Sequence, residues 1–172
     1  MPITPDTKDW TWVLERPCAE CGFSSAAVQY DEVPALIRRN AAAWAPVLDR
    51  ADVAVRPDDE TWSALEYAAH VRDVFRIFTV RLGLILDEDD PLFANWDQDA
   101  TAVAERYNEQ EPATVAAELA AAAASAADAF AAVPVEDRVR TGRRSDGARF
   151  TVTTLAQYFI HDPTHHLHDV AV

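Results

Sequence analysis

The sequence predicts an all-α protein, a four-helix bundle formed by one chain of 172 residues. Four long segments have the apolar spacing and the starting and terminating residues of helices, and modest connections join them. The length suits one domain, and 49% of the residues are apolar, which is enough to fill a core. No internal repeat divides the chain. We therefore expect residues 31–172 to form the bundle and residues 1–30 to form an arm that packs on it.

The first two helices begin with residues typical of a first turn. Pro34 and its acidic neighbours suit the start of the first helix, and Pro46 is expected to kink it or to split its end. Ser63 and Glu66 form a capping box at the start of the second helix, which the acidic run before Pro91 is expected to end. The four helices are expected at about residues 31–51, 63–86, 112–133 and 154–172.

Alanine dominates residues 113–132, which strongly favours the third helix. Residues 138–150 contain an Asp-Gly turn, so we expect a short hairpin before the last helix. Thr154 and Gln157 form a second capping box, and the last helix is expected to continue through Pro163 to the C-terminus.

The connection at residues 87–111 is longer than the loops of most bundles, and long loops are often functional. Trp96 and Asp97 in this connection are candidates to cover the mouth of the bundle.

The charge balance limits the expected partners. Fifteen Lys and Arg face 29 Asp and Glu, which gives a net charge of −14. Such a surface repels phosphate backbones and anionic lipids, so neither nucleic acid nor a membrane is expected to bind. The sequence starts without a leader pattern, and no apolar run reaches the roughly 18 residues of a membrane span. We expect a cytoplasmic protein that acts on a small molecule.

Four of the five histidines lie between residues 161 and 168. Because positions i, i+4 and i+7 share one face of a helix, His161 and His165 can reach one metal ion, and His168 is an alternative ligand. If the face of the second helix that carries His70 meets them, three imidazoles form a site with an open position, as in catalytic centres. Zn²⁺, Ni²⁺ and Fe²⁺ suit such ligands. The alternative is a metal-free bundle with solvated histidines.

Two acidic residues share the helix face of His70. Glu66 lies one turn before it and Asp73 nearly one turn after it. Either carboxylate could orient the second ring nitrogen of His70 or act as a general base, so both are candidate catalytic residues.

These positions also carry a family resemblance. Its residues are Trp62-Ser63 with Glu66 and His70, and the run His161-Asp-Pro-Thr-His165-His166. They resemble the DinB-like, or YfiT-like, metal-binding four-helix bundle superfamily over roughly residues 30 to 172. This chain departs from the usual pattern at Pro163 and at Leu167-His168, where relatives commonly have Gly-Gln.

The resemblance implies an up-down-down-up bundle, often dimeric, with a divalent metal on His70, His161 and His165. It implies either hydrolysis or transfer that uses a low-molecular-weight thiol such as mycothiol. Two alternatives stay open: a non-catalytic bundle that binds metal or sequesters a ligand, and a metal-free module that dimerises through its Ala-rich helix.

Cys18 and Cys21 form a CxxC motif with three possible roles. They can stand in a structural turn as thiols, or provide half of a zinc site that a histidine, an acidic residue or a second subunit completes. The third role is a redox or substrate-thiol function.

The only basic cluster precedes the last helix and is either a solvated hairpin or a clamp for the carboxylate or phosphate of an anionic cofactor. The candidate anion-binding residues are Arg140, Arg143 and Arg144.

Overall fold

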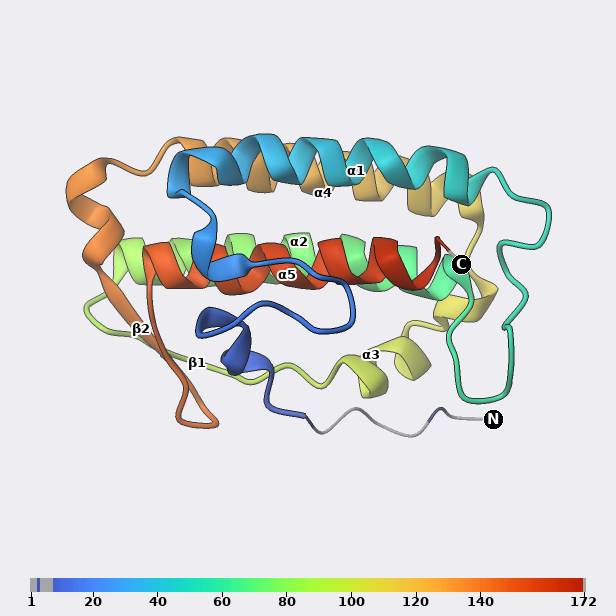
Figure 1. The fold of residues 1–172 in the computed structure, drawn as a ribbon, viewed down its shortest axis with the longest axis horizontal. Coiled ribbons are helices and arrows are strands. Elements are labelled where there is room, and N and C mark those ends of the chain that lie inside the picture. The colour runs from blue at the N-terminus through green and yellow to red at the C-terminus, as the bar shows by residue number, and fades with distance from the viewer. Residues whose placement is uncertain (1–2, 4–7, 172) are drawn as a thin grey trace.

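The computed structural model describes residue 3 and residues 8–171, so parts of the predicted arm and the last residue lie outside the described chain. Four long helices form two layers, one of α1 and α4 and the other of α2 and α5 (Figure 1). The colour gradient shows that α1 and α5 run in one direction and α2 and α4 in the other. The predicted four-helix bundle is confirmed, with a short fifth helix. The helices are α1 Val33–Leu48, α2 Ala64–Asp87, α3 Gln98–Ala104, α4 Pro112–Ala131 and α5 Val152–Asp169.

Capping boxes start two of the long helices. At α2 the prediction is confirmed: the Ser63 hydroxyl accepts from the Glu66 amide at 3.3 Å, and the Glu66 carboxylate accepts from the Ser63 amide at 2.9 Å. At α5 the box is Thr151 with Thr154, three residues earlier than predicted. Gln157 instead donates to backbone carbonyls of the N-terminal segment. The Thr154 hydroxyl accepts the hydrogen bond of the Thr151 amide, which is the role that a glutamine side chain was predicted to play.

Neither internal proline separates the helix that contains it into two parts. α1 ends two residues after Pro46, and α5 continues through Pro163. The Pro163 carbonyl accepts a hydrogen bond of 2.7 Å from the buried Asn40 amide, whose oxygen accepts from the Trp44 indole at 3.2 Å. This contact fastens α1 to the part of α5 that carries the histidines.

A three-stranded sheet corrects the all-α expectation. The predicted hairpin is present as β2 Thr141–Arg144 and β3 Arg149–Thr151, and β1 Leu92–Phe93 from the long connection pairs with β2 in parallel. A Cβ on Gly142 would lie 2.6 Å from the Ile85 side chain, so the strand lies against α2 only because this residue is glycine. About half of the connection at residues 87–111 is regular secondary structure, in β1, α3 and a 3₁₀ turn.

α4 is long and apolar enough, by length and composition alone, to cross a membrane. In this fold 39% of its apolar window is buried, and its inner face packs against α1 and α2. Phe130 of α4 stacks on Phe159 of α5 at a ring distance of 5.3 Å, in the centre of the core. We therefore treat α4 as a core helix of the bundle.

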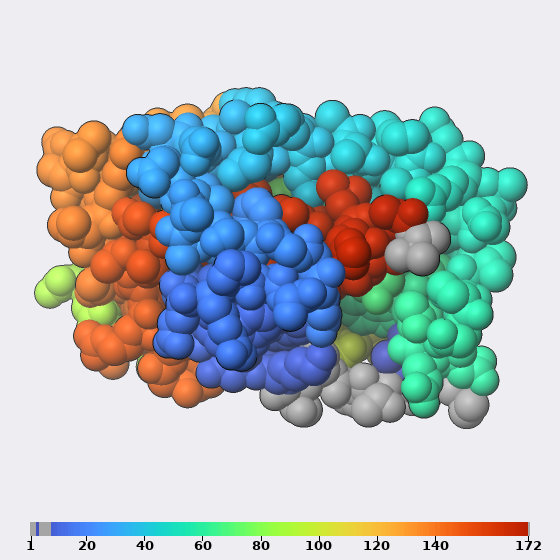
Figure 2. Space-filling view, in the orientation of Figure 1, coloured from blue at the N-terminus to red at the C-terminus, as the bar shows by residue number. Residues whose placement is uncertain are grey.

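The N-terminal segment, residues 8–32, lies across α5 (Figure 1). Figure 2 shows it in blue over the middle of that helix. Three short 3₁₀ turns shape it, and Tyr30 fixes its end by donating to the Phe130 carbonyl at 2.9 Å. This placement brings the CxxC motif to the histidines of α5.

Candidate metal centres and cavity

α5 carries two pairs of candidate metal-ligating residues that are offset by one position. His161 and His165 form one pair, and Asp162 and His166 form the other. Each pair has the i, i+4 spacing that places both side chains on one helix face. Because successive residues of an α-helix are about 100° apart around its axis, the two pairs face different neighbours. The first pair meets the N-terminal segment, and the second meets α2.

His70 of α2 meets the second pair, and we call His70, Asp162 and His166 the His–Asp–His cluster. His70 Nε2 lies 3.2 Å from Asp162 Oδ1, and His166 Nε2 lies 3.6 Å from the same oxygen. One ligand atom from each residue lies within 4.8 Å of the other two. His70 is fully buried at the base of the cluster, and the other two residues are partly exposed.

Neighbouring side chains hold the two histidine rings of this cluster in place. Trp96 from the long connection stacks flat on His70, with ring centres 5.1 Å apart and planes 3° apart. Asp169 Oδ2 lies 2.8 Å from His166 Nδ1, which leaves His166 Nε2 directed at Asp162. Metal-binding histidines commonly have such a carboxylate on the second ring nitrogen. His70 Nδ1 is buried and has no hydrogen-bond partner among the described residues.

The Asp162 carboxyl is ionised at neutral pH. Burial alone would raise its pKa, but the charges of His70 and His166 and the hydrogen bond to His70 outweigh burial and lower the pKa to about 2. An ionised carboxylate is the form that binds a metal ion.

The donor set of the His–Asp–His cluster fits a catalytic divalent metal. Two imidazoles and one carboxylate occur in catalytic zinc sites and, with further open positions, in non-haem iron sites. Two ligand atoms about 2.1 Å from a tetrahedral metal are about 3.4 Å apart. The separations of 3.2 and 3.6 Å lie on either side of this value.

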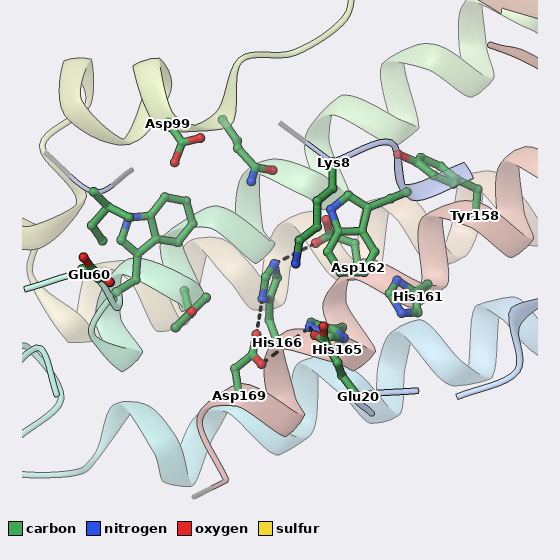
Figure 3. A pocket seen from close by; sticks show the side chains of 15 residues that line it. Lys8, Glu20, Glu60, Asp99, Tyr158, His161, Asp162, His165, His166 and Asp169 are labelled. Carbon is green, nitrogen blue, oxygen red and sulfur yellow. Dashed lines mark hydrogen bonds and ion pairs between the residues drawn. The ribbon is translucent and has the colours of Figure 1, made fainter. Parts of the chain in front are cut away.

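Two adjoining cavities open beside this cluster, with volumes of about 500 Å³ and about 450 Å³. Figure 3 shows the first, into which side chains of α5 project. Asp162 lines both cavities, so a ligand in either one lies next to the cluster. The residues common to both walls are Lys8, Trp10, Gln98, Asp99, Tyr158 and Asp162.

The second cavity has two buried guanidinium groups in its wall, those of Arg81 and Arg144. Arg144 is paired with Asp146 and donates to the Tyr158 hydroxyl at 3.0 Å. Arg81 donates to the Ala94 carbonyl at 3.1 Å, and no ion pair to it is present among the described residues. Burial, together with the positive charge of Arg144, lowers the pKa of Arg81 to about 10. Arg81 is therefore still cationic at neutral pH.

The other pair of α5 meets the CxxC motif, and we call Cys18, Cys21, His161 and His165 the Cys₂His₂ cluster. Cys18 Sγ lies 3.7 Å from His165 Nδ1, and Cys21 Sγ lies 3.7 Å from His161 Nε2. Burial, assisted by the charge of His165, lowers the pKa of His161 to about 4, so its imidazole is neutral at pH 7.

Sequence comparison places the chain in a family. A model of the DinB superfamily matches residues 35–170. The chain belongs to the DinB superfamily. YfiT from Bacillus subtilis, described as a probable metal-dependent hydrolase with an unusual four-helix bundle topology, has a similar solved structure. The TM-score is 0.65 at 17% identity, over 98% of this chain and 91% of the YfiT chain, so the likeness shows a shared fold. No curated protein matches the chain significantly.

In this DinB-superfamily chain the three predicted metal ligands are divided between two clusters. His70 lies in the His–Asp–His cluster, whereas His161 and His165 lie in the Cys₂His₂ cluster. Asp162 and His166, which are not among the predicted ligands, complete the first cluster. Their i, i+4 spacing is visible in the sequence, and counting carboxylates as ligands would have revealed it. The exposed His168 belongs to neither cluster.

Glu66 and Asp73, the two predicted catalytic residues, lie outside both clusters. Glu66 caps α2 and is bound by Arg56, with its Oε2 2.9 Å from Arg56 Nε. Asp73 accepts from Arg72 at 2.9 Å and from the Tyr107 hydroxyl. Neither carboxylate lines either cavity. Their oxygens are engaged in helix capping and ion pairs, which stabilise the fold.

Of the three arginines predicted to bind an anion, one lines the second cavity. Arg140 donates to the carbonyls of Ile85 and Glu88 at the end of α2, and Arg143 pairs with Asp90. Arg144 alone lines a cavity. The second arginine of this cavity wall is Arg81 of α2, which the sequence does not distinguish from the other residues of that helix.

Proposed function

We propose that this protein is a metal-dependent hydrolase of a small anionic molecule. A divalent metal, for which Zn²⁺ is the first candidate, would bind to the His–Asp–His cluster. The observation that carries the proposal is the position of Asp162, which belongs to this cluster and lines both cavities. A substrate in either cavity therefore lies beside the metal ligands. The description of YfiT as a probable metal-dependent hydrolase supports the same chemistry.

A divalent metal at this cluster would supply Lewis-acid activation of the substrate and a water nucleophile at neutral pH. The chain's own residues prepare the site. Asp162 contributes negative charge, and Asp169 fixes the ring of His166 through Nδ1. Trp96 covers His70 and excludes water from that side of the cluster.

Tyr158 has the position of a hydrogen-bond donor to the reacting group. It precedes Asp162 by one helical turn on the same face of α5 and lines both cavities. Its oxygen accepts from Arg144, so its own proton can be donated to a substrate oxygen. Burial raises the pKa of Tyr158 although the charge of Arg144 opposes the effect, so the phenol keeps its proton. Donors aimed at developing negative charge are a main source of catalysis in hydrolases.

The guanidinium groups of Arg81 and Arg144 support a carboxylate-bearing substrate. Arg144 has Asp146 as an anionic partner, whereas Arg81 contacts the Ala94 carbonyl and the rings of Phe78 and Phe93 and has no carboxylate partner among the described residues. A carboxylate bound in the second cavity would compensate the charge of Arg81 and form strong, charge-assisted hydrogen bonds.

Two other functions predicted from the sequence stay open as outcomes of the test. A mycothiol-type thiol in place of water would make the protein a transferase, and a bound metal without turnover would make it a binding protein. The homodimer and the cytoplasmic location likewise stay predictions.

The test uses protein purified without a His tag or a nickel column and loaded with zinc. Aryl esters and aryl amides of a dicarboxylic acid are compared with matched neutral esters and amides. We expect turnover of the carboxylated substrates that His70→Ala and Asp162→Asn abolish. Tyr158→Phe is expected to lower kcat about 100-fold without changing the metal content. His168→Ala, which changes an exposed histidine of the same helix, is the control and retains activity.

Three results would contradict the hydrolase proposal. The first is turnover that requires mycothiol, which indicates a transferase. The second is stoichiometric metal without turnover of any substrate, and the third is wild-type activity in Asp162→Asn.

A further inference from the structure

The Cys₂His₂ cluster has the dimensions of a tetrahedral metal site. Zinc bonds are about 2.3 Å to sulfur and about 2.0–2.1 Å to nitrogen, so tetrahedral sulfur and nitrogen ligands lie about 3.6 Å apart. Cys18 Sγ and Cys21 Sγ each lie 3.7 Å from one histidine nitrogen, and all four ligand atoms lie within 4.8 Å of one another. The four side chains converge on one point from two segments that are far apart in the sequence.

The backbone of the CxxC motif turns so that both thiols reach α5. The Gly22 amide donates to the Cys18 carbonyl at 2.8 Å, and the Cys18 amide donates to the Phe23 carbonyl at 2.9 Å. Gly22 has a φ of +73°, a conformation that glycine adopts without strain. Cys18 is 1% exposed, and Cys21 is partly buried.

Neighbouring groups orient the imidazole ligands. His165 directs Nδ1 at Cys18, while its Nε2 lies 3.3 Å from Glu20 and 3.6 Å from Asp169. A carboxylate on the nitrogen opposite the ligating one fixes the ring and its tautomer in metal sites. The Trp10 ring packs against the rings of both histidines, with centres 5.6 Å from His161 and 5.3 Å from His165.

We propose that the Cys₂His₂ cluster is a second metal site that binds Zn²⁺ and fastens the N-terminal segment to α5. Two sulfur and two nitrogen ligands select Zn²⁺ and fill its tetrahedral shell, which is the pattern of structural zinc sites. Binding releases the two thiol protons and involves no redox change. This assignment is independent of the proposed function, because the two clusters share no residue.

The site also fixes one wall of the active-site cavities. Lys8, Trp10 and Glu20 of the N-terminal segment line the first cavity, and the first two also line the second. Glu20 lies between the two cysteines in the sequence. Zinc at the Cys₂His₂ cluster would hold the N-terminal segment against α5. Loss of the zinc would free this segment, and with it one wall of the cavities, from the bundle.

The first test uses the wild-type protein, so it does not depend on the folding of a variant. The reduced, metal-free chain is loaded with Co²⁺, and we expect thiolate-to-cobalt charge-transfer absorption. With zinc-loaded protein, titration with a mercurial reagent is expected to release about one metal per two thiols modified. Absence of the charge-transfer band, or modification of both thiols without metal release, overturns the proposal, as does a Cys18–Cys21 disulfide in metal-loaded protein.

Variants then separate the two clusters. We expect about two zinc ions per chain in the wild type and about one in the Cys18→Ser/Cys21→Ser variant. A glutamate-specific protease should also cleave this variant faster after the exposed Glu15. His70→Ala is expected to lose the other zinc and to keep the charge-transfer band, and His168→Ala, the matched control, keeps both. Wild-type zinc content in the double cysteine variant contradicts the Cys₂His₂ site, whereas a wild-type content in His70→Ala contradicts the His–Asp–His site alone.

Discussion

Adjacent residues of α5 belong to different candidate metal clusters because a helix turns about 100° per residue. His161 and Asp162 are neighbours in the sequence, yet one meets the CxxC motif and the other meets His70. Asp169 contacts a histidine of each cluster, since it lies 2.8 Å from His166 Nδ1 and 3.6 Å from His165 Nε2. One carboxylate thus contacts a histidine of each cluster.

The stacking of Trp96 on His70 gives a prediction for metal affinity. An aromatic pair of this kind contributes about 0.5–1.5 kcal/mol beyond its buried area, and here it restrains a ligand ring. We expect Trp96→Ala to weaken zinc binding at the His–Asp–His cluster about 10-fold, as loss of an outer-shell partner does. Competition with a chromophoric chelator in the Cys18→Ser/Cys21→Ser background measures this affinity.

Trp96→Phe is the matched variant, because it retains a flat ring over His70, and it should stay close to the wild type. Equal zinc affinity in Trp96→Ala and in the wild type would show that the stack plays no part in holding the ligand.

At the scale of elements, α1 and α5 are joined at the point where Pro163 interrupts the hydrogen bonding of α5. Pro163 has no amide proton, so the helix lacks one internal hydrogen bond there. Asn40 of α1 binds the Pro163 carbonyl, and Pro163 lies between the two members of each candidate ligand pair of α5. The contact therefore supports the segment on which both clusters depend.

We expect Asn40→Ala to destabilise the protein by about 1–3 kcal/mol, because it leaves the buried Trp44 indole without its acceptor and removes the hydrogen bond from α1 to the Pro163 carbonyl. Urea unfolding of metal-free protein measures the loss. Asn40→Asp keeps one acceptor for Trp44 and should recover part of the stability. A change below about 0.5 kcal/mol in Asn40→Ala, the range of an ordinary surface substitution, would contradict this role.

The sequence predicts which segments form helices better than it predicts where each helix starts and which distant segments pair. Helix periodicity and the Ser63 box are local signals, and they gave α2 to within a residue. The predicted start of α5 is three residues too late. Both Thr151 with Thr154 and Thr154 with Gln157 have the spacing of a capping box, and the structure uses the first pair. The pairing of β1 with β2 depends on a contact between distant segments, which no local pattern contains.

The candidate site shows the same limit more clearly. The i, i+4 histidines and His70 were found, but their partners depend on which face of α5 meets α2. A rotation of one residue about the helix axis exchanges one ligand pair for the other. The proximity of Cys18 to His165 follows from the path of the N-terminal segment over α5, which composition and spacing do not specify.

At the scale of the whole molecule, Asp73 connects α2 with the segments before and within α4. It accepts from Arg72 and Tyr107, and Arg72 also binds Glu118 of α4. Burial would raise the pKa of Asp73, but Arg72 and Tyr107 outweigh it, so the pKa lies below its ordinary value of 3.8. A carboxyl with a lowered folded-state pKa stabilises the protein above the unfolded-state pKa, and this contribution is lost as pH falls through the folded-state pKa.

We therefore predict that Asp73→Asn costs about 3 kcal/mol of unfolding free energy at pH 7, because it leaves the buried Arg72 without its main partner. The cost should decrease as the pH falls below about 4. Urea unfolding from pH 7 to pH 3 in the presence of a chelator measures both effects and removes any contribution from bound metal.

Asp128→Asn is the control for this prediction, since the pair of Asp128 with Arg38 is exposed and should contribute at most about 1 kcal/mol. A cost for Asp73→Asn that is equal at pH 7 and pH 3 would contradict the role of the ionised carboxylate.

The net charge of the chain is −14, but the second cavity contains buried positive charge. Arg81 and Arg144 place two buried cations in the second cavity, beside the negatively charged Asp162. The acidic surface disfavours anionic polymers. The cavity wall also carries the carboxylates of Asp9, Asp97, Asp99, Asp146 and Asp162, so the two buried guanidinium groups are the local positions at which a small anion can bind. The two properties together fit a small carboxylate substrate.

The most direct test of the account is anomalous diffraction at the zinc edge from crystals of untagged, zinc-loaded protein. The account predicts a peak within bonding distance, about 2.0–2.2 Å, of His70 Nε2, His166 Nε2 and a carboxylate oxygen of Asp162. A peak shared by His70, His161 and His165, or no peak beside Asp162, would contradict it.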